Sequence, residues 1–516
     1  MKKRLTAFLL LAALLCAVLT GCGGGNADKT PAEKDPSTTD AAPVANEITV
    51  GIAQDLDDSL DPHKTVKAGT SEVMFNVFEG LMKPTPDGDL TPAIAESYTV
   101  SEDRKTYTFT LRKGVKFHNG DTVTAEDVIW SIERCAAATE TGIVQVEAFS
   151  VIEAIEAPDE RTVTITISEP SNEFISYMTT AVLPADYDQQ DTAPVGTGPF
   201  KFVSRTAQDS VVLEKFGEYW GTPAYLDKVT LKIIENADSL MMSLQSGAID
   251  LCSHLTSTQV AQLGGDFDVA EGTMNLVQAL YLNNAEKPFD DVRVRQALCY
   301  AVDKQEIIDL AFDGYGSPVG SSMYPAFGKY FDDSLTNYYT KDVEKAKSLL
   351  AEAGYPDGFD MTITVPSNYK PHMDTAEVLA QQLAQIGVNA TIEPIEWESW
   401  VSDVYAGRQF QSTVVGVDAS TMTARALLER FTSTYGKNFI NYNNADYDAL
   451  FQQVLTTYDD EAQTALYKDM ERNLTENAAN VYIQDLADLV AVRKGLEGVT
   501  FYPIYVLDLS TIHYAA

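Results

Sequence analysis

The side chains best suited to metal binding are thinly spread along this chain. It has five histidines, which are His63, His118, His254, His372 and His513. None of them belongs to an HExxH pattern or to a Cys/His cluster with the spacing of a metal site. The segment His118–Asp121 has the most suggestive spacing, but it is more typical of a turn between a strand and a capped helix. No metal site is therefore expected.

The sequence also lacks the common signatures of nucleophilic and nucleotide chemistry. It contains no G-x-S-x-G elbow, which would present a nucleophilic serine. Gly196-Thr197-Gly198 is too short for a dinucleotide or Walker loop, and Pro199 behind it has no N–H to donate to a phosphate. We therefore expect no catalytic residues, no cofactor and no enzymatic activity.

The N-terminus carries the one residue for which a covalent modification is expected. The basic residues Lys2–Arg4 precede the apolar stretch Leu5–Leu19, which is shorter than the roughly 20 residues of a membrane helix and typical of a signal peptide. It ends in Leu19-Thr20-Gly21-Cys22, which resembles a bacterial lipobox. Residues 1–21 are expected to be a lipoprotein signal peptide, with diacylglycerol on Cys22. The alternative is an ordinary secretory signal with an incidental cysteine.

The residues after the signal are expected to form a flexible, lipidated tether over 22–47. Between 23 and 46 there is no large apolar residue before Val44, so the segment cannot bury enough surface to offset its ordering entropy. Two acyl signals would hold the protein durably on the outer face of the cytoplasmic membrane, which is extracellular in a Gram-positive cell. The remaining cysteines stand in apolar contexts and are expected to be buried; they are Cys135, Cys252 and Cys299.

The overall charge restricts the partners of the folded part. The 516 residues include 37 Lys and Arg against 75 Asp and Glu, which gives a formal net charge of −38. This charge repels nucleic acid and anionic lipid surfaces, so only the lipid anchor is expected to connect the body to the membrane. It favours solubility and, modestly, cationic or zwitterionic small solutes. We expect a monomer.

The elements that would position a binding site alternate between strands and helices from residue 48 onward. Tyr107, Phe109 and Leu111 alternate with threonines, as in a half-buried strand, and Thr124 with Asp127 predicts a capping box. Helix–strand pairs separated by glycine are expected at 239–246 and 249–251, at 342–353 and 361–365, and at 377–386 and 388–392. This pattern indicates two α/β lobes.

Four segments resemble a known family. They are YTFTLRKGVKFHNGDTVTAEDVIWS at 107–131, GTGPFKF at 196–202, LNNAEKPFDDVRVRQALCYAVDKQEII at 282–308 and SLLAEAGYPDGF at 348–359. In this order and at these separations they resemble the extracytoplasmic solute-binding proteins of ABC importers, in the oligopeptide/dipeptide/nickel-binding family (solute-binding protein family 5). The resemblance covers about 48–516. The matched residues have mainly structural interpretations, so they identify the family more than the ligand.

The resemblance implies a two-lobed α/β fold of the periplasmic-binding-protein type (type II), with an extra subdomain in the N-terminal lobe and a ligand cleft between the lobes. The first lobe would comprise 48–280 and 487–516, and the second 281–486. The implied function is to capture short peptides and deliver them to the transmembrane subunits of an ABC permease. A metal chelate or an oligosaccharide could replace the peptide. An extracellular peptidase and a surface chaperone or adhesin are the alternatives from other classes.

The resemblance also suggests residues for the ligand site. In peptide-binding members an Asp of the second lobe pairs with the ligand's α-ammonium group, often after a Gly-Trp pair. Here the matching residues are Gly416, Val417, Asp418 and Ala419, so that valine replaces the tryptophan. Asp418 is therefore the candidate partner of the ammonium. An Asp after a strand is also often a turn residue or a helix cap, and both interpretations remain open.

Five further residues are candidates for the cleft. Arg425 lies on the following helix and would meet a ligand carboxylate or lie on a solvated face. Tyr281 and Asn283 lie near the expected hinge and would line the cleft or serve the core and the strand ladder. Thr70 and Ser71 follow Leu60-Asp61-Pro62, where the family places cleft residues.

Overall fold

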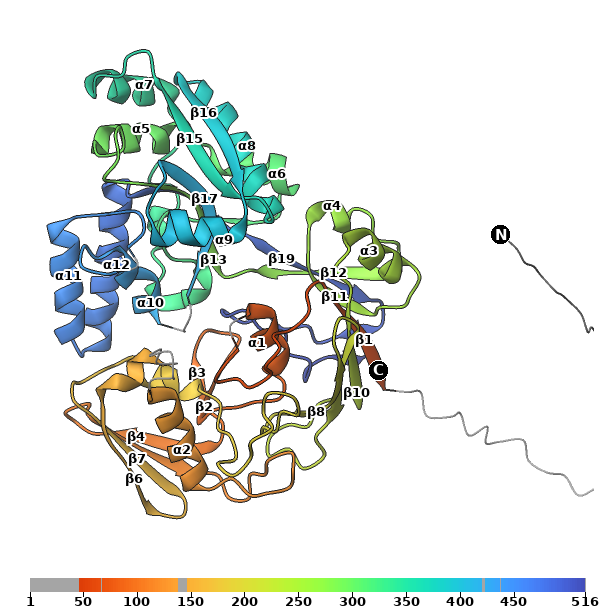
Figure 1. Ribbon diagram of the computed structural model, residues 1–516. Helices are drawn as coiled ribbons and strands as arrows, with labels where there is room; N and C mark the ends of the chain where they lie inside the picture. Colours follow the sequence, from red (N-terminus) through yellow and green to blue (C-terminus); the bar gives the residue numbers. More distant parts are fainter. Residues whose placement is uncertain (1–45, 66, 138–145, 420–422, 437, 516) are drawn as a thin grey trace, which may run out of the picture. The chain divides into compact units, whose positions relative to one another are not determined.

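Three β-sheets organise the chain in the computed structural model, which describes residues 46–515 except 66, 138–145, 420–422 and 437 (Figure 1). The seven-stranded sheet, with the helices on it, forms the first lobe. Its strands lie in the order β12 (Phe267–Thr273), β19 (Ala487–Arg493), β11 (Leu251–Leu255), β1 (Glu47–Ile52), β10 (Lys228–Ile233), β9 (Ser210–Lys215) and β8 (Phe200–Thr206).

The second lobe is built on a six-stranded sheet. Its strands lie in the order β14 (Ser317–Pro318), β18 (Asn480–Asp485), β13 (Leu276–Leu282), β17 (Ser412–Asp418), β15 (Phe359–Pro366) and β16 (Val388–Ile395). A four-stranded sheet in the order β4 (Ala95–Val100), β5 (Thr106–Leu111), β7 (Thr162–Ile167) and β6 (Ile152–Asp159) forms the subdomain with α2 (Ala125–Ala136). Two-stranded pairs join β2 (Met82–Pro84) to β3 (Leu90–Pro92) and β20 (Leu496–Glu497) to β21 (His513–Tyr514).

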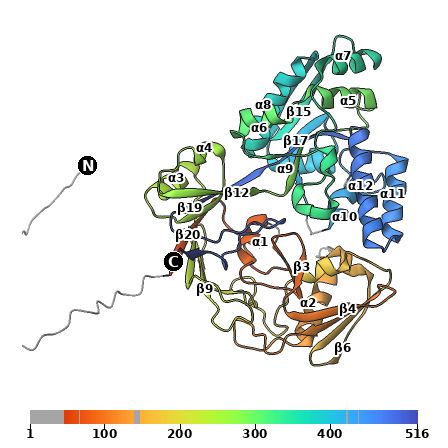
Figure 2. The same cartoon turned by 180° about the vertical axis from the view of Figure 1, so that it is seen from behind.

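The remaining helices divide between the lobes. Those before β13 are α1 (Ala68–Met74), α3 (Ala237–Gln245) and α4 (Ser257–Val260), and α3 and α4 lie beside β12 and β19 in both views (Figures 1 and 2). The second lobe contains α5 (Val292–Ala301), α6 (Lys304–Phe312), α7 (Val343–Glu352), α8 (Lys370–Ala384), α9 (Trp397–Ser399), α10 (Ala424–Leu428), α11 (Ala445–Thr456) and α12 (Asp460–Glu476). Short turns of helix are η1 (Glu147–Val151), η2 (Phe174–Thr179), η3 (Pro325–Tyr330), η4 (Asp333–Leu335), η5 (Trp400–Ala406) and η6 (Glu429–Phe431).

The expected α/β fold with two lobes and an extra subdomain is confirmed. The capping box is present, because the Thr124 hydroxyl accepts from the Asp127 N–H at 3.3 Å and the Asp127 carboxylate accepts from the Thr124 N–H at 2.9 Å. The strand expected at 249–251 begins only at Leu251, since Asp250 uses its N–H and its carboxylate to bind Thr49 across from it. The helix expected at 377–386 begins earlier, at Lys370, where Pro371 suits the first turn.

The glycines of GTGPF allow two backbones to approach each other closely. A side chain on Gly198 would place its Cβ 2.5 Å from the Asn76 carbonyl oxygen, and Gly196 meets the Val77 backbone in the same way. His118, in the expected turn, joins this contact: its Nδ1 accepts from the Gly196 N–H (3.3 Å) and its Nε2–H donates to the Gly198 carbonyl (3.0 Å). Burial lowers the pKa of His118 to about 4, so the ring is neutral and structural.

Alternate residues of β13 pack into different cores. Ala279 and Tyr281 face the core beside α10, α11 and α12, whereas Leu280 and Leu282 face the core beside α5 and α8. The second sheet is therefore covered on both faces, as the period-two geometry of a strand requires. The predicted burial of the cysteines is confirmed for Cys135, Cys252 and Cys299.

The chain passes between the two sheets twice, at 274–275 and at Leu486, and we call these the crossing segments. They run antiparallel, with Thr273 opposite Ala487 and the Met274 N–H bound to the Leu486 carbonyl at 2.8 Å. The expected boundary between 280 and 281 falls inside β13, because all of this strand belongs to the second sheet. Asn275 takes the left-handed conformation, with φ of 59°, that turns the chain from one sheet to the next.

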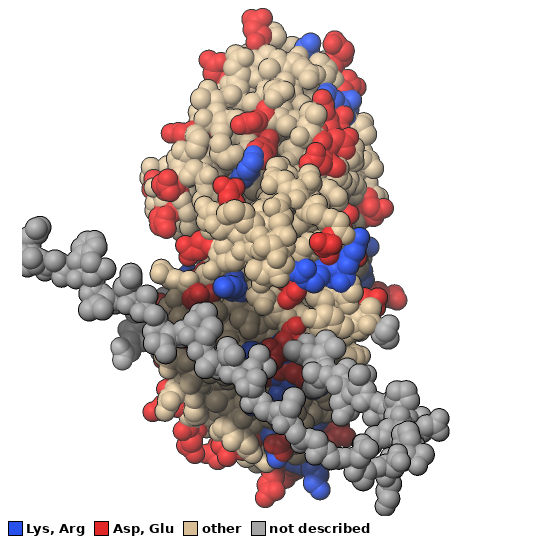
Figure 3. Space-filling model, turned by 90° about the vertical axis from the view of Figure 1, so that its right-hand side faces the viewer, with Lys and Arg blue, Asp and Glu red and all other residues tan. Residues whose placement is uncertain are grey.

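The charges seen on one face of the molecule are mostly acidic. Asp and Glu side chains are scattered over this face, and the basic side chains form only small groups among them (Figure 3). The expected signal peptide and Cys22 lie outside the described residues, and β1 already begins at Glu47. No helix in the described part of the chain has the length and apolar character needed to cross a membrane.

Candidate ligand-binding site

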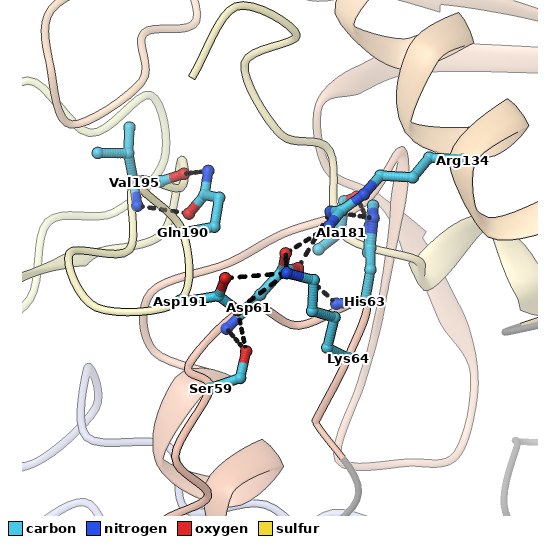
Figure 4. A network of polar contacts seen from close by, with 9 residues as sticks. All are labelled: Ser59, Asp61, His63, Lys64, Arg134, Ala181, Gln190, Asp191 and Val195. Carbon is cyan, nitrogen blue, oxygen red and sulfur yellow. Dashed lines mark hydrogen bonds and ion pairs between the residues drawn. The ribbon is translucent and has the colours of Figure 1, made fainter. Parts of the chain in front are cut away.

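The loop that leads into α1 is held by a buried ion pair (Figure 4). Asp61 is 1% exposed, and its two carboxylate oxygens accept hydrogen bonds from Arg134 on α2 at 2.5 and 3.1 Å. Arg134 also donates to Nδ1 of His63 at 3.1 Å, so the Nε2–H of His63 donates to the Ala181 carbonyl at 2.8 Å. Burial lowers the pKa of His63, so the ring is neutral. The loop is thus tied to the subdomain.

A second part of this network fixes the outer side of the same loop. Lys64 and Ser59 both donate to the Asp191 carboxylate, at 2.9 and 2.5 Å, and Gln190 exchanges two 2.9 Å hydrogen bonds with the Val195 backbone (Figure 4). Thr70 and Ser71, on the helix that follows, differ in exposure. The Thr70 side chain is buried and its hydroxyl accepts from the Asp57 N–H at 2.7 Å, whereas Ser71 is exposed.

Asp418 is the last residue of β17, at the end of the second sheet nearest the crossing segments. It lies opposite Leu276, the first residue of β13. Its side chain is exposed, and none of the described residues makes a hydrogen bond or ion pair with its carboxylate. Its backbone carbonyl accepts from Arg430 Nη2 at 3.0 Å. A carboxylate placed in this way can accept hydrogen bonds from a cationic ligand group.

A second carboxylate lies on the other side of Leu276. Oδ1 of Asp485, the last residue of β18, accepts from the Leu276 N–H at 3.1 Å. Asp485 is fully buried, and its Oδ2 has no partner among the described residues. Burial raises the pKa of Asp485 to about 8, so at neutral pH this group is mostly protonated. The end of the sheet therefore combines an exposed acidic side chain, Asp418, with a buried and largely neutral carboxyl group, Asp485.

Tyr324 connects this end of the second sheet to the first lobe. Its hydroxyl accepts from the Ala419 N–H and donates to the Pro503 carbonyl at 3.5 Å. Burial raises the pKa of Tyr324, and Asp485 and Asp418 raise it further. The Tyr324 hydroxyl therefore bridges the first-lobe chain beyond β20 and the segment that carries Asp418.

His254 carries a positive charge on the first-lobe side. Its Nδ1 lies 2.9 Å from Asp488 Oδ1 and its Nε2 lies 2.8 Å from Glu72 Oε1, which come from β19 and α1. Tyr505 stacks on the ring, with the centroids 4.6 Å apart. Burial by itself would lower the pKa of His254, but Glu72 and Asp488 together raise it well above its usual value. His254 therefore links α1 to the strand that leaves the crossing segment at Leu486.

Two candidates lie in the interior of the second lobe. Tyr281 is fully buried and donates to the Val277 carbonyl at 2.9 Å. Asn283 is 1% exposed, and its amide donates to the Phe410 carbonyl at 2.9 Å while its oxygen accepts from Asn441 at 2.8 Å. Both side chains are therefore used in the core and in the connections of the sheet.

The neighbours of Asp418 also have internal partners. The Gly416 N–H donates to Nε2 of His372 at 3.2 Å, and a Cβ at this position would lie 2.8 Å from Leu276 Cδ1. Val417 and Ala419 are buried in the core beside α10 to α12. Of the segment 416–419, only the Asp418 side chain is exposed to a large extent.

Arg425 is paired within its own helical segment. Its Nε and Nη2 donate to the Glu429 carboxylate at 2.7 and 3.1 Å, and its guanidinium lies over the Phe451 ring. Its backbone N–H points to Oε1 of Glu173, in the subdomain, at 3.4 Å. Arg425 is thus near an interlobe contact, with its charge already neutralised.

An open pocket lies elsewhere on the second lobe. It has a volume of about 490 Å³, and its lining includes Thr364, Glu393 and Gln411. Gln411 directly precedes β17, whereas Asp418 ends that strand, so roughly 20 Å of extended chain separate the pocket from the candidate carboxylate.

Sequence reasoning missed Tyr324, Asp485, His254 and Glu173. The one local signal was that of Asp485, an acidic residue two positions after the apolar stretch Val481–Ile483. His254 gave no signal, since its two carboxylate partners are 182 and 234 residues away in the sequence. Such contacts follow from topology and not from spacing along the chain.

Comparisons with known proteins identify the family. The model of the bacterial extracellular solute-binding proteins, family 5 (middle), matches residues 89–439. The glutathione-binding protein GsiB of Salmonella choleraesuis is 30% identical over 449 residues, which cover 83% of this chain and 86% of that protein.

Two solved structures show the same fold. The binding protein AgaA of A. tumefaciens R10, in complex with agropinic acid, superposes with a TM-score of 0.74 at 30% identity, covering 91% of this chain and 99% of that one. The periplasmic binding protein DppA of Helicobacter pylori, in complex with the peptide STSA, gives 0.76 at 25% identity, covering 91% and 98%. The chain therefore belongs to the bacterial extracellular solute-binding proteins of family 5, the substrate-binding receptors of ABC importers.

Proposed function

We propose that this chain is a lipid-anchored receptor that captures short peptides and passes them to the permease of an ABC importer. The observation that carries the peptide assignment is the exposed carboxylate of Asp418, which has no partner among the described residues. A free peptide always presents an α-ammonium group, and a charge-assisted hydrogen bond to it is strong in a partly desolvated site. Two relatives support the assignment, because glutathione is a tripeptide and DppA was solved with a peptide.

The geometry around Asp418 suits a zwitterionic ligand. Asp485 is mostly neutral at pH 7, so it adds little repulsion between carboxylates, and Tyr324 brings the first lobe to the same point. Arg425 is neutralised by Glu429, so we do not assign it to the ligand carboxylate. We retain Ser71, which is exposed on α1, as a candidate contact from the first lobe.

Calorimetry with trialanine and N-acetyl-trialanine tests the ammonium contact. Asp418→Asn removes the charge and keeps the shape, and we expect it to weaken trialanine binding by about 1.5–3 kcal/mol, the range for hydrogen bonds to charged groups. The acetylated peptide, which lacks the ammonium, should be nearly indifferent to the change. Glu344→Gln is the matched control, because the Glu344 side chain is 90% exposed on α7. Equal losses for both peptides would contradict the role of Asp418.

A second candidate keeps the receptor role and replaces the peptide by a non-peptide solute, such as a metal chelate or an oligosaccharide. Two observations favour it: Val417 stands where peptide-binding members often carry tryptophan, and AgaA was solved with agropinic acid. Mass spectrometry of the material that copurifies with the folded protein separates the two candidates. A series of masses that correspond to short peptides supports the peptide receptor, and a single non-peptide mass supports the receptor for another solute.

A further inference from the structure

The subdomain touches the second lobe through two adjacent residues, Asn172 and Glu173. Glu173 Oε1 accepts from the Tyr467 hydroxyl on α12 at 2.6 Å and from the Arg425 N–H on α10 at 3.4 Å. Asn172 donates to Gln463 Oε1 at 3.0 Å and to the Tyr458 carbonyl at 3.2 Å. Each residue thus makes two hydrogen bonds to the second lobe, with partners that lie 252 to 294 positions away in the sequence.

Asn172 and Glu173 are themselves held in place within the subdomain. Asn172 Oδ1 accepts a hydrogen bond from Arg104, which lies in the turn between β4 and β5. Glu173 directly precedes η2, whose Phe174 is buried in the subdomain core. The pair is therefore held by its own sheet and does not depend on the second lobe for its position.

The partners Tyr467, Arg425 and Gln463 belong to the second lobe. The chain connects this lobe to the first sheet only at the crossing segments. In both ribbon views the subdomain that contains β4, β6 and α2 lies on the side of the second lobe where α10 and α12 end, and β6 is on its far side (Figures 1 and 2). Rotation about 274–275 and Leu486 would separate Glu173 from Tyr467 without breaking either sheet, since the crossings carry all the backbone connections. The contact is specific to the arrangement in which the lobes approach each other.

Several titratable groups face the Glu173 carboxylate. They are Tyr467 on α12, Arg425 on α10, Glu429 on η6 and Tyr330 on η3. Behind them, Lys329 lies over the Tyr330 ring and Tyr177 lies near Arg425. Arg425 is shared with Glu429, and Lys329 is paired with Asp460 at 2.7 Å. The carboxylate therefore has a phenol and a backbone N–H as its direct donors, but no cation of its own.

The free energy of the contact between the subdomain and the second lobe then depends on the protonation of Glu173. Burial raises the pKa of Glu173 above its ordinary value, and the opposing effects of Tyr467 and Arg425 do not cancel this rise. With the lobes apart, the carboxylate would be hydrated and titrate normally. The closed arrangement thus binds a proton more tightly than the open one. Closure is favoured below the ordinary pKa and weakened as the pH rises through the raised one.

We propose that Asn172 and Glu173 form a proton-sensitive latch that holds the second lobe against the subdomain and releases it as the pH rises. The effect on ligand affinity rests on the proposed receptor function, whereas the latch itself can be measured without a ligand. Glu173 is in this scheme a positioning residue, because it contacts α10 and α12 and acts on a ligand only through the approach of the two lobes.

Small-angle scattering of the unliganded protein at pH 5 and pH 7 tests the latch directly. The wild type should have a larger radius of gyration at pH 7. Glu173→Gln keeps the acceptor and removes the charge, so its radius should stay at the compact value at both pH values. Glu173→Ala loses the acceptor and should show the larger radius at both. Glu344→Gln, on exposed α7, should behave as the wild type.

Calorimetry with trialanine over the same interval gives the functional readout. The peptide keeps both its charges between pH 5 and 7, since its termini titrate near 3.5 and 8. The wild type should bind it more tightly at pH 5, by up to about tenfold for each unit of pKa difference between open and closed states. Glu173→Gln should show no such dependence, and Tyr467→Phe should show a larger one.

The outcomes are distinct. A wild-type radius that does not change with pH, or a pH dependence that survives in Glu173→Gln, would overturn the latch. If trialanine does not bind at all, the peptide assignment fails while the scattering experiment still decides the latch. Circular dichroism melts of each variant distinguish opening of the lobes from loss of the fold.

Discussion

At the scale of single residues, charged groups away from water are paired with partners from remote parts of the chain. Asp61 is held by Arg134, and His254 by Glu72 and Asp488. Removing one member of a buried pair leaves the other uncompensated, which costs more than the pair contributes. Asp485 lacks such a cation and instead stays mostly protonated, as its pKa of about 8 indicates. Asp418 is the opposite case, an exposed carboxylate available to a ligand.

Replacement of His254 by Gln tests its charge. The pKa of His254 is raised in the folded state, so the stabilisation is fully present below the unfolded pKa and is lost progressively as the pH rises from there through the folded pKa. We expect His254→Gln to lower the free energy of unfolding by about 2 kcal/mol, the scale of hydrogen bonds to charged groups. Urea unfolding of both proteins between pH 6 and 9 measures the difference.

The pH dependence of that difference is the decisive feature. With a raised pKa the gap between wild type and variant narrows as the pH rises from 6 to 7.5, because the unfolded ring loses its proton over this range while the folded ring keeps it. A gap that stays constant across this interval would contradict the two-carboxylate clamp. His513→Gln serves as the control, because that ring lies 3.8 Å from Glu497 in a more exposed position.

At the scale of elements, backbone proximity decides which segments can meet. The segment 196–198 lies against the backbone of 76–77, and His118 bonds to it from the turn before α2. This contact joins the subdomain to the first lobe near α1. The GTGPF motif is therefore a packing signature, which is why it accompanies the fold and not a particular ligand.

Gly198→Ala tests this interpretation. Its Cβ would lie 2.5 Å from the Asn76 carbonyl oxygen, which is backbone and cannot move away as a side-chain end could. We expect a loss of about 2 kcal/mol or more in the free energy of unfolding, within or above the usual range for overpacking. The control is Gly217→Ala, where nothing lies within 4 Å of the added carbon, and it should change stability by less than about 0.5 kcal/mol. Equal effects of the two substitutions would exclude the close approach as the cause.

At the scale of the whole molecule, an acidic body and two lobes joined at two crossings favour capture of a small solute outside the cell. The net charge of −38 repels polyanions, and the face in Figure 3 shows basic residues only in small groups. The lobes meet at Tyr324 with Pro503 and at Glu173 with Tyr467, so closure is distributed over two contacts.

The proposed anchor predicts where the molecule is found. Cys22→Ala should release the protein from the membrane fraction of cells, because the lipid would be its only durable attachment. Cys16→Ala, inside the apolar stretch, should leave the distribution unchanged. Fractionation followed by immunoblotting, with mass spectrometry of the N-terminal peptide, gives both readouts. Wild type and Cys22→Ala in the same fraction would contradict lipidation.

Much of the fold could be predicted because its signals are local. The capping box of Thr124 and Asp127 acts over three residues, the alternation of Tyr107 to Leu111 follows from strand geometry, and glycine ends helices wherever it follows them. The strand expected at 249 began later, at Leu251, because Asp250 bonds to Thr49 some 200 residues away. Local reasoning fails where a distant backbone competes for the same hydrogen bonds.

Some features of the candidate site likewise follow from local sequence, and others follow only from the tertiary structure. Sequence alone determined the family, the α/β lobes, the acidic charge and the choice of Asp418, because these depend on composition, short motifs and residue order. Only the tertiary structure decided that Tyr281 and Asn283 belong to the interior and that Arg425 is paired with Glu429. It likewise decided that His254 is held by two carboxylates of the first lobe, that Asp485 is buried beside Leu276, and that Glu173 contacts Tyr467 of the second lobe. The physical reason is that burial and charge pairing depend on which remote segments the two sheets bring together.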